Sequence, residues 1–269
     1  MSNGGFTIGR VAGIEVHLHP SLLIVLALVS FSLATGVLPA WHPDWSAAMR
    51  WSFALVASLL LIVSVAVHEL SHAWVGRAGG VPVWRVTLFV FGAMAHLEAE
   101  PRSWRVELWT ALAGPAASLV LGGAFLAAGA ALVASETLAA PPGHLLAALG
   151  PTATLLLWLG QINLVLAAFN MLPGFPLDGG RVLRALIWRS TGDMFAATRF
   201  SARAGQALSL LLIGTGFAMV FGLRLPLLGG GPAGGTWLAL MGWFLNAAAL
   251  AGYRDVSLRA EVHPLAKAS

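Results

Sequence analysis

Two histidines and a glutamate form the clearest chemical pattern in this sequence. His68, Glu69 and His72 occur as H-E-x-x-H inside a long apolar segment. Residues four apart in a helix lie on the same face, so both imidazoles can bind one zinc ion. Glu69 directly follows the first histidine and can act as a general base toward a water that the metal activates. The pattern therefore predicts a metal site with hydrolytic chemistry.

The surroundings of this pattern favour function over packing. The alternative interpretation is that both histidines simply pack within a helix bundle. A charged residue at the centre of a membrane helix costs about 2.5–3.5 kcal/mol on insertion scales. Glu69 lies in a segment apolar enough to span a membrane, so a functional role is the stronger hypothesis.

A catalytic zinc site usually has three protein ligands and one open position. Asp178 is the best candidate for the third ligand, because it follows Pro173 and Pro176, which end an apolar helix, and precedes a glycine pair that permits unusual backbone geometry. The alternative is that Asp178 only caps the helix expected over 179–189. We favour metal binding, since Glu69 and Asp178 are the only carboxylates that the pattern places well within apolar segments. Arg181 is interpreted as one of the basic residues that set the orientation in the membrane. The alternative is that it holds the Asp178 carboxylate in place.

The composition places the chain in a lipid bilayer. Of its 269 residues, 58% are hydrophobic and 10% are charged, against about 25% charged in soluble domains. The net charge of +4 comes without a basic block, which argues against nucleic acid as a partner. Cysteine is absent, which excludes disulfides, a thiol nucleophile and a thiolate metal site. Any metal must therefore be bound by histidine and carboxylate.

Six apolar stretches are long enough, or nearly so, to cross a hydrocarbon core of about 30 Å. With the N-terminus inside, 13 of the 15 Lys and Arg residues fall on the inner side, and only Arg50 and Arg224 fall outside. The positive-inside rule therefore predicts that both termini are cytoplasmic. His68 then lies roughly 13 Å below the inner surface, with Asp178 on the same side. The predicted spans cover 21–38, 51–75, 108–133, 152–172, 206–221 and 236–253.

The predicted fold is an α-helical integral membrane protein with about six transmembrane helices and two short β-hairpins. One hairpin is expected over 6–18 and the other over 83–97, between the second and third helices. The predicted domains are a cytoplasmic N-terminal hairpin (1–20), a six-helix protease domain (21–255) and a cytoplasmic tail (256–269). The first apolar run lacks the features of a cleavable signal peptide and is interpreted as an uncleaved helix.

The paired motifs resemble the site-2 protease family of intramembrane zinc metalloproteases, in its branch of sporulation-factor proteases and archaeal homologues. The matching segments are His68-Glu-Leu-Ser-His72 and Asn170-Met-Leu-Pro-Gly-Phe-Pro-Leu-Asp178-Gly-Gly. This resemblance implies one zinc ion bound at His68, His72 and Asp178, with Glu69 as base. It also implies that Asn170 lies near the site and holds substrate or stabilises the oxyanion.

The resemblance further implies that the substrates are transmembrane proteins, such as an anti-sigma factor, a membrane-bound transcription factor or a signal-peptide remnant. A substrate strand is expected to add beside the 83–97 hairpin, since an unwound backbone must be satisfied at membrane depth. Many members of the branch carry paired cystathionine-β-synthase domains after the last helix, whereas this sequence ends at Ser269, so nucleotide regulation is not expected.

Two other classes of function remain as alternatives. A metal transporter also uses buried His and Asp, although its ligands should follow a route across the bilayer. A non-catalytic homologue would bind substrates without cutting them, but all four required residues are present in this sequence. His17 and His19 flank a predicted membrane entry and are interpreted as interfacial side chains.

Overall fold

The fold is described from a computed structural model covering residues 5–90, 92–97, 101–136, 149–225 and 229–266. The chain divides into two compact units. Unit 1 comprises Met1–Pro101 and Ala113–Ala168, and unit 2 comprises Arg102–Leu112 and Phe169–Ser269.

The described residues include six helices that are long and apolar enough to cross a membrane, which confirms the predicted fold class. Three consecutive pieces make the first span, and one shorter helix, α7, stands between the fourth and fifth spans. The helices are α1 (Leu22–Ser32), the π-helical turn η1 (Leu33–Val37), α2 (Leu38–Trp41), α3 (Ala47–Ala78), α4 (Trp104–Glu136), α6 (Pro151–Asn170), α7 (Asp178–Thr191), α8 (Met194–Val220) and α9 (Pro232–Ala266).

Two helices extend well beyond the predicted spans. Helix α8 begins at Met194, because the Asp193 carboxylate accepts hydrogen bonds from the Phe195 and Ala196 amides at 2.8 and 3.0 Å and caps the helix there. Helix α9 continues to Ala266 and so runs through most of the segment predicted as a tail. Hydropathy alone marks the apolar part of a helix, not its capped ends.

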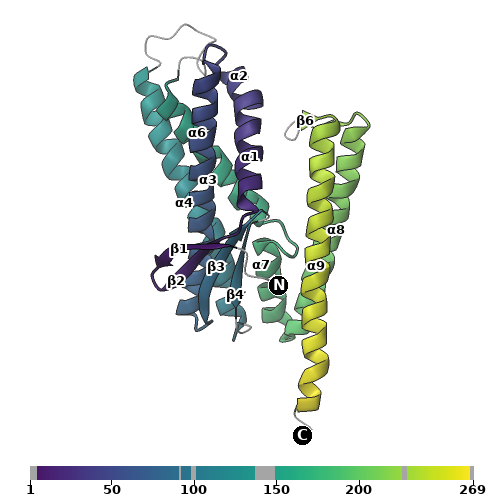
Figure 1. Cartoon of the computed structure of the whole chain (residues 1–269). Helices are drawn as coiled ribbons and strands as arrows, with labels where there is room; N and C mark the ends of the chain where they lie inside the picture. The colour runs from purple at the N-terminus through teal and green to yellow at the C-terminus, as the bar shows by residue number, and fades with distance from the viewer. Residues whose placement is uncertain (1–4, 91, 98–100, 137–148, 226–228, 267–269) are drawn as a thin grey trace. The chain divides into compact units, whose positions relative to one another are not determined.

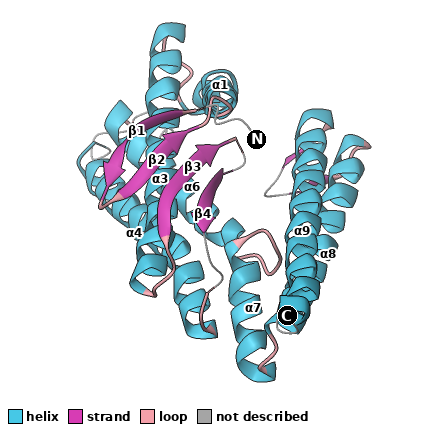
Figure 2. Cartoon of the chain, turned by 60° about the horizontal axis from the view of Figure 1, so that its bottom comes forward, coloured by secondary structure: helices cyan, strands magenta, loops and turns pink. Residues whose placement is uncertain are grey.

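Both predicted hairpins are present and join into one sheet in the order β1-β2-β3-β4 (Figure 2). The first hairpin turns at Ala12 and Gly13, which both have positive φ. Strands β2 and β3 pair in parallel, with Glu15 opposite Arg85. The strands are β1 (Phe6–Val11), β2 (Ile14–Leu18), β3 (Val83–Phe89) and β4 (Gly92–Leu97).

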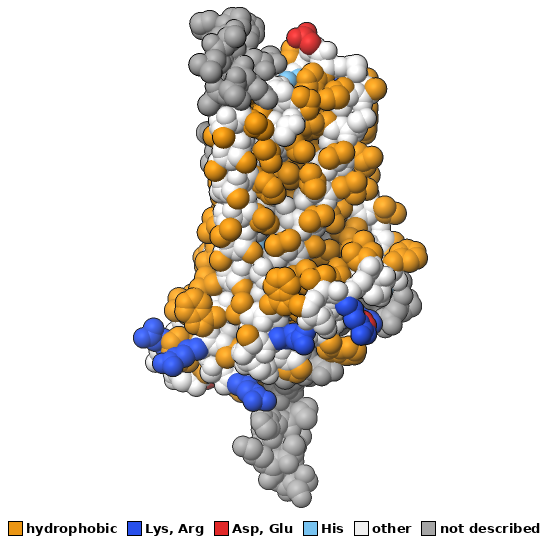
Figure 3. Space-filling model, turned by 90° about the vertical axis from the view of Figure 1, so that its left-hand side faces the viewer, with side chains coloured by type: hydrophobic (Ala, Val, Ile, Leu, Met, Phe, Trp, Pro, Cys, Tyr) orange, Lys and Arg blue, Asp and Glu red, His pale blue; other side chains and the backbone are white. Residues whose placement is uncertain are grey.

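Within unit 1, α1 and α3 lie side by side, with the sheet near the foot of α1 (Figure 1). Leu33 and Leu38 pack with Phe53 and Ala57 into a buried cluster between the first span and α3. Helices α4 and α6 approach closely, since a Cβ on Gly122 would come within 3.1 Å of the Gly160 carbonyl oxygen. Apolar side chains cover the face drawn in Figure 3, and Lys and Arg gather at its lower end.

Within unit 2, α8 packs against both α7 and α9. The segment between α6 and α7 is fixed to α8 where the Phe175 amide donates to the Ser201 carbonyl at 3.2 Å. A Cβ on Gly205 would collide with the Phe175 carbonyl, so glycine is required at this close approach. A short ladder, β5 (Arg224–Leu225) with β6 (Gly229–Gly230), precedes α9.

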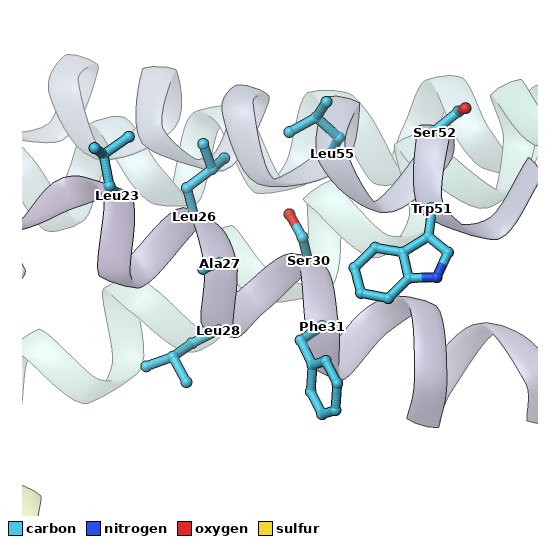
Figure 4. Close-up of a pocket in the computed structure, with 9 residues that line it drawn as sticks. All are labelled: Leu23, Leu26, Ala27, Leu28, Ser30, Phe31, Trp51, Ser52 and Leu55. Atoms are coloured by element: carbon cyan, nitrogen blue, oxygen red, sulfur yellow. The ribbon is translucent and has the colours of Figure 1, made fainter. Parts of the chain in front are cut away.

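An apolar groove of about 730 Å³ lies between α1 and α3 (Figure 4). Leu23, Leu26, Phe31, Trp51 and Leu55 are among its lining residues. None of the predicted site residues lines this groove, so the chemistry predicted from the sequence has to be sought elsewhere.

Candidate metal centre

The two motif histidines point their ring nitrogens at each other inside unit 1. Both project from α3, and His68 and His72 are only 2% and 6% exposed. Their Nε2 atoms lie 3.2 Å apart, with the rings in an edge-to-face arrangement. Two Nε2 atoms that converge in this way share one point to which both can donate a lone pair. This is the geometry expected from imidazoles one helical turn apart.

Helix α4 supplies both the room and the orientation for this pair. A Cβ on Gly114 would lie 2.2 Å from His72 Nε2 and 2.6 Å from His68 Nε2. Glycine at this position therefore leaves open the space in front of both nitrogens. One turn later, Ser118 Oγ lies 2.8 Å from His68 Nδ1, and both residues are buried. We assign the proton to Nδ1, which donates to Ser118 and leaves the Nε2 lone pair for a metal.

Helix α6 adds a second buried polar contact one turn from the histidines. Asn163 is fully buried and donates from Nδ2 to Ser64 Oγ at 3.2 Å and to the Leu159 carbonyl at 2.8 Å. Ser64 precedes His68 by four residues on α3. Helices α3, α4 and α6 are thus joined by hydrogen-bonded polar side chains around the histidine pair, in segments that are otherwise apolar.

Asp178 opens helix α7 in unit 2 and is 9% exposed. The residue that caps this helix is Leu177, without a side-chain hydrogen bond, so the alternative that Asp178 is the N-cap is wrong. The preceding loop folds back over the helix start. A Cβ on Gly179 would meet the Met171 carbonyl oxygen, and one on Gly180 would meet the Gly174 backbone. The glycine pair therefore lets the loop close tightly around the base of Asp178.

His68, His72 and Asp178 form a group of described residues that could hold a metal ion. One possible ligand atom from each lies within 4.8 Å of the others. Two imidazole nitrogens and one carboxylate oxygen are a donor set that suits zinc with a position left open. The open space beside Gly114 also fits an ion, because a side chain there would fill it.

The other two predicted site residues, Glu69 and Asn170, lie on α3 and α6. Glu69 is half-buried on α3, directly after His68. Asn170 is the last residue of α6 and is also half-buried. It precedes the loop that leads to Asp178, as the sequence motif requires.

The structure adds residues that the sequence analysis did not connect with the site. Gly114 and Ser118 are small residues of α4, and neither is among the predicted site residues. Glu107 lies in the first turn of α4, at the start of the third span, and is 0% exposed. The predicted span begins at 108, so the sequence analysis left this glutamate just outside it. Arg181 donates to Glu107 rather than serving topology alone. One signal in the sequence could have indicated this cluster: Glu107 directly precedes an apolar run, and Arg181 and Arg184 are three residues apart on a later helix.

The chain is similar to proteins named as zinc metalloproteases. It is 39% identical over 242 residues to zinc metalloprotease Rip3 of Mycobacterium tuberculosis, covering 90% of this chain and 57% of that protein. It is 28% identical over 205 residues to zinc metalloprotease MJ0392 of Methanocaldococcus jannaschii, covering 76% of this chain and 51% of that one. The chain thus spans little more than half the length of these relatives.

A solved structure and a family model agree with these relatives. The site-2 protease from Methanocaldococcus jannaschii matches with a TM-score of 0.58 and 25% identity, over 93% of this chain and 95% of that one. The model of peptidase family M50 matches residues 56–148 and 137–212. These stretches include both histidines, Ser118 and Asp178. The chain therefore belongs to peptidase family M50, the site-2 protease family of membrane zinc metalloproteases.

Proposed function

We propose that this chain is a zinc-dependent intramembrane endopeptidase of the H-E-x-x-H type. The observation that carries the proposal is the convergence of two buried Nε2 atoms, 3.2 Å apart, on the space that Gly114 leaves open. Glu69 stands beside them on the same helix. Buried ionisable side chains inside a membrane span mark functional sites.

His68, His72 and Asp178 would hold one zinc ion. Zinc held there would act as a Lewis acid and lower the pKa of a water molecule to about 7. Glu69 would accept a proton from the attacking water and pass it to the departing amine nitrogen, so the C–N bond breaks without a free amide anion. Asn170, at the end of α6, would hold the substrate carbonyl or donate to its developing oxyanion.

The proposed substrates are transmembrane proteins. Their helices must unwind locally, because backbone hydrogen bonds otherwise protect the scissile bond. Strand β4 is an edge of the sheet in this structure, and an unwound segment could add to it as a further strand. By the positive-inside rule the termini and the site lie toward the cytoplasm, from which water would reach the site.

Cleavage of a single-pass model substrate by purified protein in liposomes tests this function. Wild type should cut the substrate, and Glu69→Gln should not, while both retain about one zinc per chain. A metal transporter would bind zinc, leave the substrate intact and move zinc across the liposome membrane. A non-catalytic homologue would capture the substrate uncut. Failure of wild type to bind zinc under metal-replete conditions would refute the proposal.

A further inference from the structure

Glu107 is a fully buried carboxylate held by two arginines within unit 2. It lies in the first turn of α4, and its Oε1 atom accepts from Arg184 Nη2 at 2.6 Å and from Arg181 Nε at 3.1 Å. The arginine side chains are 10% and 21% exposed. Removing either the carboxylate or an arginine would leave a buried charge without its counter-ion, which is strongly destabilising. The three side chains are therefore expected to stay together.

Both arginines belong to α7, the helix that Asp178 opens. Arg181 follows Asp178 by three residues, which is less than one turn. Arg184 also lies over the ring of Phe175, with its Cζ 5.4 Å from the ring centroid. Phe175 belongs to the loop that leads into Asp178. Through Arg184, Glu107 is therefore linked to the Phe175 side chain, which precedes Asp178 in the chain. Through Arg181 it is linked to the first turn of α7, which follows Asp178.

A second contact between α4 and α7 supports the same arrangement. Arg189, in the last turn of α7, places its Cζ 4.9 Å from the Trp104 ring centroid at the start of α4. The two ends of α7 are thus both attached to the first turn of α4, one by the ion cluster and the other by a cation–π contact.

The face of α4 that carries Glu107 also carries Gly114 and Ser118, which lie against the histidine pair. Gly114 and Ser118 follow Glu107 by seven and eleven residues on one continuous helix, and such spacings return to nearly the same face. Ala111 lies between Glu107 and Gly114 on this face of the helix and is 0% exposed. Gly114 and Ser118 contact the His68–His72 pair within unit 1, and Glu107 holds α7 within unit 2.

We propose that Glu107 is a positioning residue of the metal centre: through Arg181 and Arg184 it fixes the start of α7 and with it the Asp178 carboxylate. This inference rests on the proposed function, in which Asp178 is a zinc ligand. Glu107 itself touches neither metal nor substrate in this role. It acts through Arg181, Arg184 and the start of α7.

Zinc affinity, measured by competition with a chelator in detergent, tests this role. Asp178→Ala should weaken zinc binding, because a ligand is removed. Glu107→Gln should weaken it by about 10–100-fold, as loss of an outer partner of a ligand does. Glu107→Asp, which keeps the charge, should recover part of this loss. Glu15→Gln is the matched control, because Glu15 is also held by two arginines but lies in the sheet of unit 1. The zinc affinity of this variant should equal that of wild type.

The visible spectrum of cobalt-loaded protein gives a second readout that a merely structural role would not move. Glu107→Gln should shift this spectrum toward that of Asp178→Ala. If Glu107→Gln does not fold, Arg184→Lys replaces it, since lysine keeps a cation for Glu107 but loses the planar fork. Arg184→Lys should also weaken zinc binding.

The outcomes separate this inference from the proposed function. If Asp178→Ala weakens zinc binding but folded Glu107→Gln or Arg184→Lys keeps wild-type affinity and spectrum, the positioning role of Glu107 is wrong and the ligand set stands. If Asp178→Ala binds zinc as tightly as wild type, the proposed ligand set fails and the positioning role fails with it.

Discussion

Two glutamates in this molecule are each held by two arginines, but the Glu15 side chain is partly exposed and the Glu107 side chain is fully buried. Glu15 accepts from Arg10 at 2.6 Å and Arg85 at 3.0 Å on the outer face of the sheet, where Arg10 is 71% exposed. Glu107 accepts from Arg181 and Arg184 at the start of α4 and is 0% exposed. One glutamate and two arginines therefore form a surface cluster in unit 1, and the same combination of residue types forms a buried cluster in unit 2.

This difference should decide what each cluster contributes. Exposed ion pairs are typically worth about 0–1 kcal/mol, because water and salt screen them. A buried pair gains little over an apolar replacement, but removing one partner costs about 3–5 kcal/mol. The surface cluster aligns β1, β2 and β3 and can be lost cheaply. The buried cluster connects α4 with α7, and its loss should affect both stability and the position of Asp178.

The largest expected effect is that of Glu107→Gln on stability. It leaves two arginines without their carboxylate, so the free energy of unfolding should fall by about 3–5 kcal/mol. Thermal unfolding in detergent, with Glu15→Gln as the matched control, measures the difference. Equal melting temperatures for the two variants would mean that burial does not distinguish the clusters.

A smaller effect is expected when the buried charges are removed together. Glu107→Leu combined with Arg184→Leu replaces the closest pair with apolar side chains, which often costs little or even stabilises. Arg181, at 21% exposure, can extend toward solvent. This double variant should therefore regain most of the melting temperature lost in Glu107→Gln while zinc binding stays weak. Recovery of both properties together would show that the cluster contributes only stability.

Salt should affect the two regions differently. The Debye length falls from about 10 Å at 0.1 M to about 3 Å at 1 M, which screens exposed charges far more than buried ones. Hydrogen exchange of the β1 amides should become somewhat faster at high salt, whereas exchange at the start of α7 should not change. A salt response at α7 as large as that at β1 would contradict the burial of the Glu107 cluster.

The smallest effect is expected from acid acting on Glu15. The hydrogen bond from Arg10, followed by that from Arg85, holds the pKa of Glu15 below its ordinary value of 4.5. A carboxyl with a lowered folded-state pKa stabilises the fold above its unfolded pKa and loses this contribution as pH falls through the folded pKa. Melting curves below pH 4.5 should therefore converge for wild type and Glu15→Gln. A gap that widens in acid would reverse the assigned sign.

The sequence predicted the six spans and both hairpins, because these depend on local composition. It also predicted that His68 and His72 lie together, because they are one helical turn apart. The parallel pairing of β2 with β3 joins residues about 70 positions apart, such as Glu15 and Arg85, and no local pattern indicates it. The helix ends at Met194 and Ala266 also escaped prediction, since capping and polar extension lie outside a hydropathy window.

The supporting residues of the site could not be predicted for a similar reason. Ser118 and Gly114 look like ordinary small residues of a membrane helix, and only the packing of α4 against α3 shows that one contacts His68 Nδ1 and the other opens the space at Nε2. Glu107 lies at the very edge of an apolar run. Its partners are more than 70 residues away in sequence, so its burial follows from tertiary structure alone.

The most direct test of the proposed centre is X-ray absorption at the zinc edge of purified wild type and Asp178→Ala. Wild type should show about one zinc with two imidazole nitrogens at about 2.0–2.1 Å and carboxylate oxygen at about 2.0–2.2 Å. In Asp178→Ala both imidazoles should remain and the carboxylate should be lost. A wild-type spectrum without two imidazole ligands, or one that Asp178→Ala leaves unchanged, would contradict the ligand set of His68, His72 and Asp178.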